Sequence, residues 1–169
     1  MTETASATPE TRPPAARRTI AQMWRDATAT ERARPAYLVE AEGGWDEVSW
    51  QDADAGVRAY ANGLLARGVQ KGDAFALLAQ NSLDWALLDF AFARIGAIGV
   101  PIYANSAPRD VGYLLEHSEA VGIVCEDAEQ LAKVEAVSDE LPGLAHVLTY
   151  HDLAGLAAHV PCSAHPILW

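Results

Sequence analysis

The chain has 169 residues, half of them hydrophobic, and a formal net charge of -11 at pH 7. This charge argues against nucleic acid as a partner, because phosphate binding needs a basic surface. The only cysteines are Cys125 and Cys162, too few for a disulfide framework, so we expect a reducing, cytoplasmic location. Cys125 lies in an apolar run, and we expect it to be a small core residue.

The sequence predicts neither a signal peptide nor a transmembrane segment. The N-terminus is rich in proline and threonine and lacks the apolar core of a signal peptide. The longest apolar stretch, residues 83–103, contains three charged residues and a proline. It also divides into a helix and a strand, so we do not interpret it as a membrane span.

The N-terminal part of the chain predicts a tail, a helix and a hairpin. Residues 1–18 combine prolines with small polar residues and show no apolar period, which is typical of a disordered tail. Thr19 is expected to cap a short helix. Two short strands, 36–39 and 47–48, flank a pair of glycines, and this pattern predicts an antiparallel β-hairpin.

Repeated βα units are expected from residue 49 onward. Four short, mainly apolar runs are predicted as strands: 74–79, 98–102, 121–125 and 146–149. Their even spacing leaves room for one helix and two turns, which implies right-handed crossovers and a mainly parallel sheet. Because the run 98–102 is apolar throughout, we expect both of its faces to be covered. The predicted fold class is therefore α/β.

Capping signals predict where the helices begin and end. Ser82, or Asn81 beside it, can accept the free N–H groups at the start of a helix over 83–95. Gly96 can supply the left-handed residue that ends this helix. Pro108 suits the first position of the following helix, where its missing N–H costs nothing.

The best polar candidates for a site follow the second predicted strand of the parallel sheet. In such sheets ligands bind beyond the carboxyl ends of the strands, and Tyr103, Asn105 and Ser106 lie there. The alternative is that Asn105 and Ser106 only form a turn and a cap for the next helix. Signatures of nucleotide loops, catalytic triads and zinc sites are missing from the sequence, so no catalytic, cofactor-binding or metal-binding residue is predicted.

The regular pattern decays from residue 151. We expect one helical turn at 152–158 and an irregular tail over 151–169, either because the chain is truncated or because its last residues are not native to the fold. A sheet cut at this point would leave an unpaired strand edge, and we expect self-association through that edge.

Three segments in the order of the chain carry a family resemblance: ALLAQNSLDW, ARIGAIGVPIY and APRDVGYLLEHSEAVGIV. Together with the preceding segments TIAQMW, RPAYLVEAEGGWDEVSW and ANGLLARGVQKGD, they resemble the N-terminal part of the AMP-binding, acyl-adenylate-forming synthetases, over residues 19–150. The segment VPIYANSAP followed by YLLEHS is most similar to the long-chain fatty-acid–CoA ligases. The resemblance implies an incomplete N-terminal α/β subdomain of such an enzyme.

The resemblance also implies a chemistry, in which Mg-ATP adenylates a carboxylate and coenzyme A then accepts the acyl group. The family's phosphate loop and its catalytic lysine match no segment of this chain, and Lys71 and Lys133 lie in no matching motif. We therefore expect a fragment of a long-chain fatty-acid–CoA ligase that is inactive alone, from a cytoplasmic or membrane-peripheral enzyme. Two alternatives stay open: a ligase for an aryl or amino acid, and a non-catalytic α/β binding module.

Overall fold

The computed structural model describes residues 18–157, with side chains described up to Leu153. The disordered tail expected at the N-terminus lies almost wholly outside the described residues. The end of the expected irregular tail, from residue 158 onward and including Cys162, also lies outside them.

The described elements alternate between helices and strands along most of the chain. In order they are α1 (Ile20–Thr28), β1 (Tyr37–Ala41), β2 (Gly44–Val48), α2 (Trp50–Ala66), β3 (Ala74–Ala79), α3 (Leu83–Ile95), β4 (Ile98–Tyr103), α4 (Pro108–His117), β5 (Gly122–Cys125), α5 (Ala128–Glu135), the short 3₁₀ helix η1 (Ser138–Glu140), β6 (His146–Thr149) and α6 (Tyr150–Ala157).

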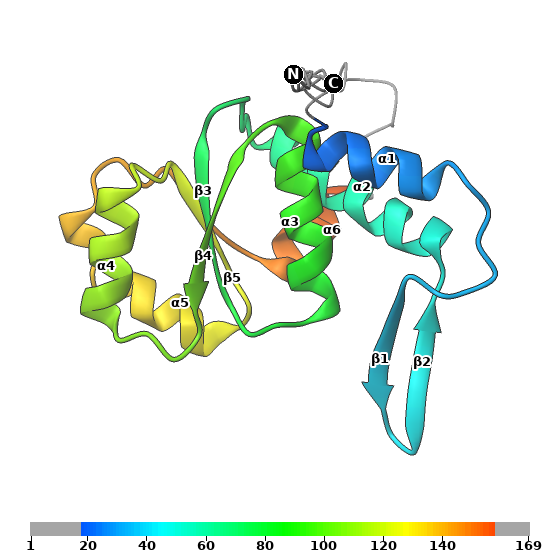
Figure 1. Cartoon of the computed structure of the whole chain (residues 1–169). Helices are drawn as coiled ribbons and strands as arrows, with labels where there is room; N and C mark the ends of the chain where they lie inside the picture. Colours follow the sequence, from blue (N-terminus) through cyan, green and yellow to red (C-terminus); the bar gives the residue numbers. More distant parts are fainter. Residues whose placement is uncertain (1–17, 158–169) are drawn as a thin grey trace, which may run out of the picture.

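Four strands form one parallel sheet in the order β4-β3-β5-β6, which confirms the predicted α/β class. Helices α4 and α5 cover one face of the sheet, and α3 covers the other together with α2 and α6 (Figure 1). Strands β1 and β2 form the expected antiparallel hairpin, in which Tyr37 is paired with Val48. The hairpin projects away from the sheet and its helices (Figure 1).

Strand β3 lies at the centre of the molecule and separates two hydrophobic cores. Successive side chains of a strand point to opposite faces of its sheet. Phe75 and Leu77 accordingly belong to the core beneath α2 and α3, whereas Ala76 and Leu78 belong to the core beneath α4 and α5. All four side chains are buried, which explains why this run is apolar without alternation.

The prediction that both faces of the second parallel strand are covered is wrong. Strand β4 is an edge strand, and Ile98 and Tyr103 are 56% and 83% exposed, whereas Ile102 is buried. Nothing in the described part of the chain pairs with its outer edge. Pro101 fits this position, because a residue without an N–H is tolerated on an edge strand and not in the centre of a sheet.

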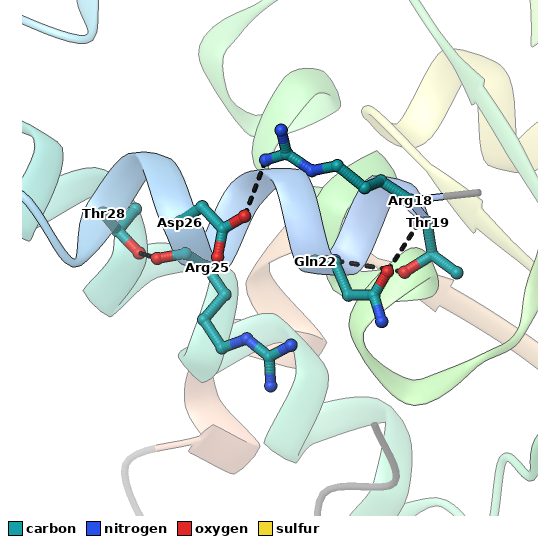
Figure 2. Close-up of polar contacts among 6 residues, drawn as sticks. All are labelled: Arg18, Thr19, Gln22, Arg25, Asp26 and Thr28. Atoms are coloured by element: carbon teal, nitrogen blue, oxygen red, sulfur yellow. Dashed lines mark hydrogen bonds and ion pairs between the residues drawn. The ribbon is translucent and has the colours of Figure 1, made fainter. Parts of the chain in front are cut away.

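Helix α1 is held by polar contacts at its start and along one side (Figure 2). Thr19 and Gln22 form a capping box, with hydrogen bonds of 3.1 and 2.9 Å between each side chain and the other residue's backbone N–H. The side chain of Arg18, which precedes the helix, extends along it and donates from Nη2 to Oδ2 of Asp26 at 2.6 Å. On another side of the helix Trp24 is buried against α2 and α3, so α1 is amphipathic.

The last described helix is longer than the single turn expected there. Helix α6 begins at Tyr150, directly after β6, and Asp152 accepts hydrogen bonds of 2.8 Å from both the backbone N–H and the hydroxyl of Thr149. Leu153 is fully buried, and its carbonyl oxygen would lie 2.9 Å from a side chain added at Gly63. The glycine in α2 therefore permits the close approach of α6.

Candidate binding site at the carboxyl edge of the sheet

The order of the strands places a crevice at the carboxyl ends of β3 and β5. The chain leaves β3 through α3, on one face of the sheet, and leaves β5 through α5, on the opposite face (Figure 1). Where neighbouring parallel strands send their connections to opposite faces, the loops separate and leave room for a ligand. The fold itself therefore marks this edge as the place for a binding site.

An open cleft of about 780 Å³ lies at this edge. It is lined by residues from the ends of three strands and from α5: Ala79, Gln80, Asn81, Tyr103, Ala104, Asn105, Asp127, Glu129, Gln130 and Lys133. The structure thus places Tyr103 and Asn105 at the cleft, together with groups from β3 and α5. Ser106, the third residue singled out from the sequence, is not part of the lining.

The loop after β4 forms a turn, and it contributes no side-chain cap to α4. The backbone N–H of Ser106 donates to the carbonyl of Tyr103 at 3.0 Å. The N-cap of α4 is Ala107, which makes no side-chain capping bond, and Pro108 occupies the first turn. The turn considered as an alternative from the sequence is therefore present, and the cap is not. This leaves the Asn105 side chain exposed at the cleft.

Lys133 links α5 to the loop after β4. Its ammonium donates to the carbonyl oxygen of Ala104 at 2.6 Å and to Oε1 of Gln130 at 3.0 Å. Glu129 is 3.7 Å away, and the lysine side chain is only 17% exposed. Gln130 is itself buried. Sequence reasoning did not select these two residues, because their place beside Tyr103 depends on the order of the strands.

The carboxylates near the cleft have structural partners. Glu126 accepts a hydrogen bond of 2.8 Å from the backbone N–H of Gln80, which joins the ends of β5 and β3. Asp127 is the N-cap of α5 and accepts from the N–H of Gln130 at 2.9 Å. Both groups stabilise the edge of the sheet, and neither is positioned as a free acid or base.

This cleft does not fit Mg-ATP. A triphosphate would meet Asp127 and Glu129, with the single ammonium of Lys133 already bonded to protein oxygens. No group of three acidic, histidine or cysteine side chains suitable for a metal occurs among the residues that the structure describes. The side chains of Gln80, Asn81 and Asn105 instead suit a neutral polar group, which carboxamides can recognise as donors and acceptors.

Cys125 is the last residue of β5, close to the carboxyl edge of the sheet. Its side chain is fully buried, as predicted for a core residue. Burial, together with the negative charges of Asp127 and Glu135, raises the pKa of its thiol to about 12. A thiol with this pKa is not ionised near neutral pH and does not act as a nucleophile.

The described part of the chain combines a parallel α/β layer, an open cleft at the carboxyl edge of its sheet and an appended hairpin. The comparisons define the family: the model of the AMP-binding enzymes matches residues 20–163. The chain belongs to the AMP-binding enzyme family, which confirms the resemblance seen in the sequence.

Several relatives are named as ligases. The long-chain-fatty-acid–CoA ligase FadD15 of Mycobacterium bovis is 36% identical over 121 residues, which are 70% of this chain and 20% of that protein. The crotonobetaine/carnitine–CoA ligase of Escherichia coli is 28% identical over 163 residues, which are 88% of this chain and 32% of that protein. The chain thus spans from a fifth to a third of the length of these curated relatives.

Solved structures show the same fold. A fatty acyl CoA synthetase of Mycobacterium tuberculosis superposes with a TM-score of 0.74 at 23% identity, over 89% of this chain and 30% of that one. The N-terminal domain of FACL13 from the same organism also gives a TM-score of 0.74, at 22% identity, over 88% of this chain and 37% of that one.

None of the described helices combines the length and apolarity that crossing a membrane requires.

Proposed function

We propose that this chain forms the N-terminal α/β part of a long-chain fatty-acid–CoA ligase. The observation that carries the proposal is the 36% identity over 121 residues to a ligase named for long-chain fatty acids. In the complete enzyme a carboxylate oxygen of the fatty acid attacks the α-phosphorus of ATP and displaces pyrophosphate. The sulfur of coenzyme A then attacks the acyl carbonyl and displaces AMP.

The role proposed for this part is to present one wall of the substrate region and not to carry the reacting groups. The cleft at the carboxyl edge supplies neutral polar side chains, and its lysine is bonded within the protein. ATP, Mg²⁺ and coenzyme A are therefore assigned to the complete enzyme, outside this cleft. We expect the purified chain alone to form no acyl adenylate.

A chimera tests the proposal. Residues 20–157 replace the matching segment of the Mycobacterium bovis relative, and the host enzyme with its own segment reinserted is the control. We expect the chimera to form palmitoyl-CoA from palmitate, ATP and coenzyme A, and the isolated chain to catalyse no palmitate-dependent ATP–pyrophosphate exchange. A folded chimera without ligase activity, or an isolated chain with exchange activity, would contradict the proposal.

A second candidate is a ligase of the same family for a different carboxylate. It is favoured by the crotonobetaine/carnitine–CoA ligase, whose match extends over 88% of this chain. Two measurements separate the two candidates. The encoding DNA is sequenced beyond Trp169, and the longest protein that it encodes is assayed with palmitate, benzoate and carnitine. Thioester formation with palmitate supports the first candidate, and formation with one of the other two acids supports the second. A stop codon without a further family motif would favour a non-catalytic binding module.

The location and the self-association of the chain stay proposals as well. We propose a cytoplasmic enzyme, in keeping with its few cysteines. We also propose that the outer edge of β6, the last strand of the sheet, associates with another strand, because an exposed edge presents unpaired N–H and C=O groups. Sedimentation over a range of concentrations checks the second point, and a monomer at every concentration would contradict it.

A further inference from the structure

A second hollow lies far from the carboxyl edge, between α1, α3 and the first residues of β1 and α2. This groove has a volume of about 470 Å³ and shares no lining residue with the cleft described above. Its lining includes four aromatic side chains, those of Trp24, Tyr37, Trp50 and Phe90. A concave, largely apolar hollow of this size with few polar groups is typical of small-molecule sites.

The aromatic wall is held in place. The ring centroid of Trp24 lies 4.1 Å from that of Phe90 and 5.9 Å from that of Trp50. The indole N–H of Trp24 donates to Asp54 at 3.0 Å, which fixes the orientation of the ring. Met23, on the rim, is 55% exposed. Among the polar residues drawn in Figure 2, Arg18 pairs with Asp26, and Thr19 pairs with Gln22.

Among the residues that the structure describes, Asp89 is the one carboxylate in the lining of the groove. It is half-buried, and it makes no hydrogen bond or ion pair within the part of the chain that the structure describes. Burial raises the pKa of this carboxyl above its usual range. Asp54 contrasts with it, because this carboxylate has the indole N–H of Trp24 at 3.0 Å, Arg58 at 3.3 Å and Arg94 at 3.6 Å. A half-buried charge without a partner favours a ligand of opposite charge.

We propose that this groove binds a small organic cation, an ammonium group carried on an apolar body. The ammonium would lie against Asp89, and the aromatic rings would contact both the cation and the apolar body. Aromatic faces attract ammonium groups, most strongly when these are alkylated and easily desolvated. Trp50 already has such a contact, with the guanidinium carbon of Arg32 4.9 Å from its ring centroid. The net charge of -11 also attracts cations toward the molecule.

The test compares two ligands of the same shape on the full chain. The phenethyltrimethylammonium ion is the probe, and (3,3-dimethylbutyl)benzene, in which carbon replaces nitrogen, is its neutral isostere. Binding is followed by NMR shifts of the indole N–H groups of Trp24 and Trp50. Trp45, which is 64% exposed on the hairpin, serves as an internal control. We expect saturable shifts at the groove, with the isostere binding about tenfold more weakly.

Two variants test whether the carboxylate of Asp89 causes the preference for the cation over its neutral isostere. We expect Asp89→Asn to bind the cation about fivefold to tenfold more weakly and to leave the isostere unaffected. Asp110→Asn removes the same charge from an exposed position in α4, and we expect it to behave like the original chain. Because Asp89 has no partner in the described residues, we expect the melting temperature of Asp89→Asn to be unchanged or higher.

Three results would overturn the proposal. The first is equal affinity of the original chain for the cation and the isostere, a comparison that needs no variant. The second is unchanged cation binding in Asp89→Asn. The third is shifts that appear at Trp45 as strongly as at the groove, since this would indicate adsorption to exposed aromatic side chains.

Discussion

Removing the ammonium of Lys133 should loosen the loop after β4. The substitution Lys133→Met keeps the aliphatic stem and removes the donor to Ala104, at 2.6 Å, and to Gln130, at 3.0 Å. Gln130 is 5% exposed, so its amide oxygen would lose a partner in a place that water reaches poorly.

The expected loss can be worked out from these contacts. A hydrogen bond from a charged donor contributes about 1.5–3 kcal/mol when the site is dry. The side chain of Lys133 is 17% exposed at an open cleft, where water replaces part of the interaction. We therefore expect the lower end, about 1.5 kcal/mol, which corresponds to a melting temperature about 3–6 °C lower for a chain of this size.

Thermal unfolding measures the global effect, and limited digestion with chymotrypsin measures the local one. Tyr103 is 83% exposed, and cleavage after it requires the loop to open. We expect cleavage there to become about tenfold faster in Lys133→Met. Cleavage after Tyr113, which is 61% exposed on α4, should not change.

The chain supplies a matched control in its other lysine. Lys71 is exposed and makes no hydrogen bond or ion pair among the described residues, so Lys71→Met should alter the free energy of unfolding by less than about 0.5 kcal/mol. Equal digestion rates after Tyr103 in both variants would show that the Lys133 contact does not hold the loop, and would refute the reasoning.

Three further predictions concern the core and the ends of elements. Gly122→Ala should lower the unfolding free energy by about 2–3 kcal/mol in urea titrations, because its methyl group would overlap the buried ring of Phe75, whereas Gly143→Ala, with open space around it, should change it little. The Cys125 peptide should stay unmodified by iodoacetamide at pH 8 in the native chain and react in urea, because burial raises the thiol pKa to about 12. A hydrogen bond from the backbone N–H at the end of β6 lowers the pKa of Asp152. The ionised carboxylate of Asp152 therefore stabilises the fold at pH values above the pKa that this group has in the unfolded chain, and this contribution is lost as the pH falls through its lower pKa in the folded chain. We expect Asp152→Asn to reduce the dependence of the melting temperature on acid pH, measured by thermal unfolding.

The local parts of the fold could be predicted because their signals are local. Ser82 accepts the N–H of Trp85 as an N-cap, and Gly96 ends the same helix with a φ of 74°. The strand expected at 74–79 occupies those same residues. Caps, turns and apolar runs act within a few residues of sequence, so reading the chain in order is sufficient to find them.

The order of the strands in the sheet could not be predicted from such local signals. The wrong prediction that both faces of β4 are covered follows from this. An apolar run such as Ile98–Tyr103 is compatible with a central strand or with an edge strand that is covered on one face. Pro101 carried the missing information, because a central parallel strand would need its N–H.

The residues of the two candidate sites also differ in whether local sequence signals could reveal them. Tyr103 could be found because it ends a strand, and the carboxyl ends of parallel strands are where ligands bind. Asp89 lies in the middle of α3 and Lys133 in the last turn of α5. From the sequence alone, a charged residue at either place is indistinguishable from one on a solvated face. Lys133 reaches Ala104 only because the chain passes from β4 over β3 to β5, which places α5 beside the loop after β4. A charged residue thus gains a role from its neighbours in space, and comparing Lys133→Met in α5 with Lys71→Met in the turn before β3 is the direct test of that role.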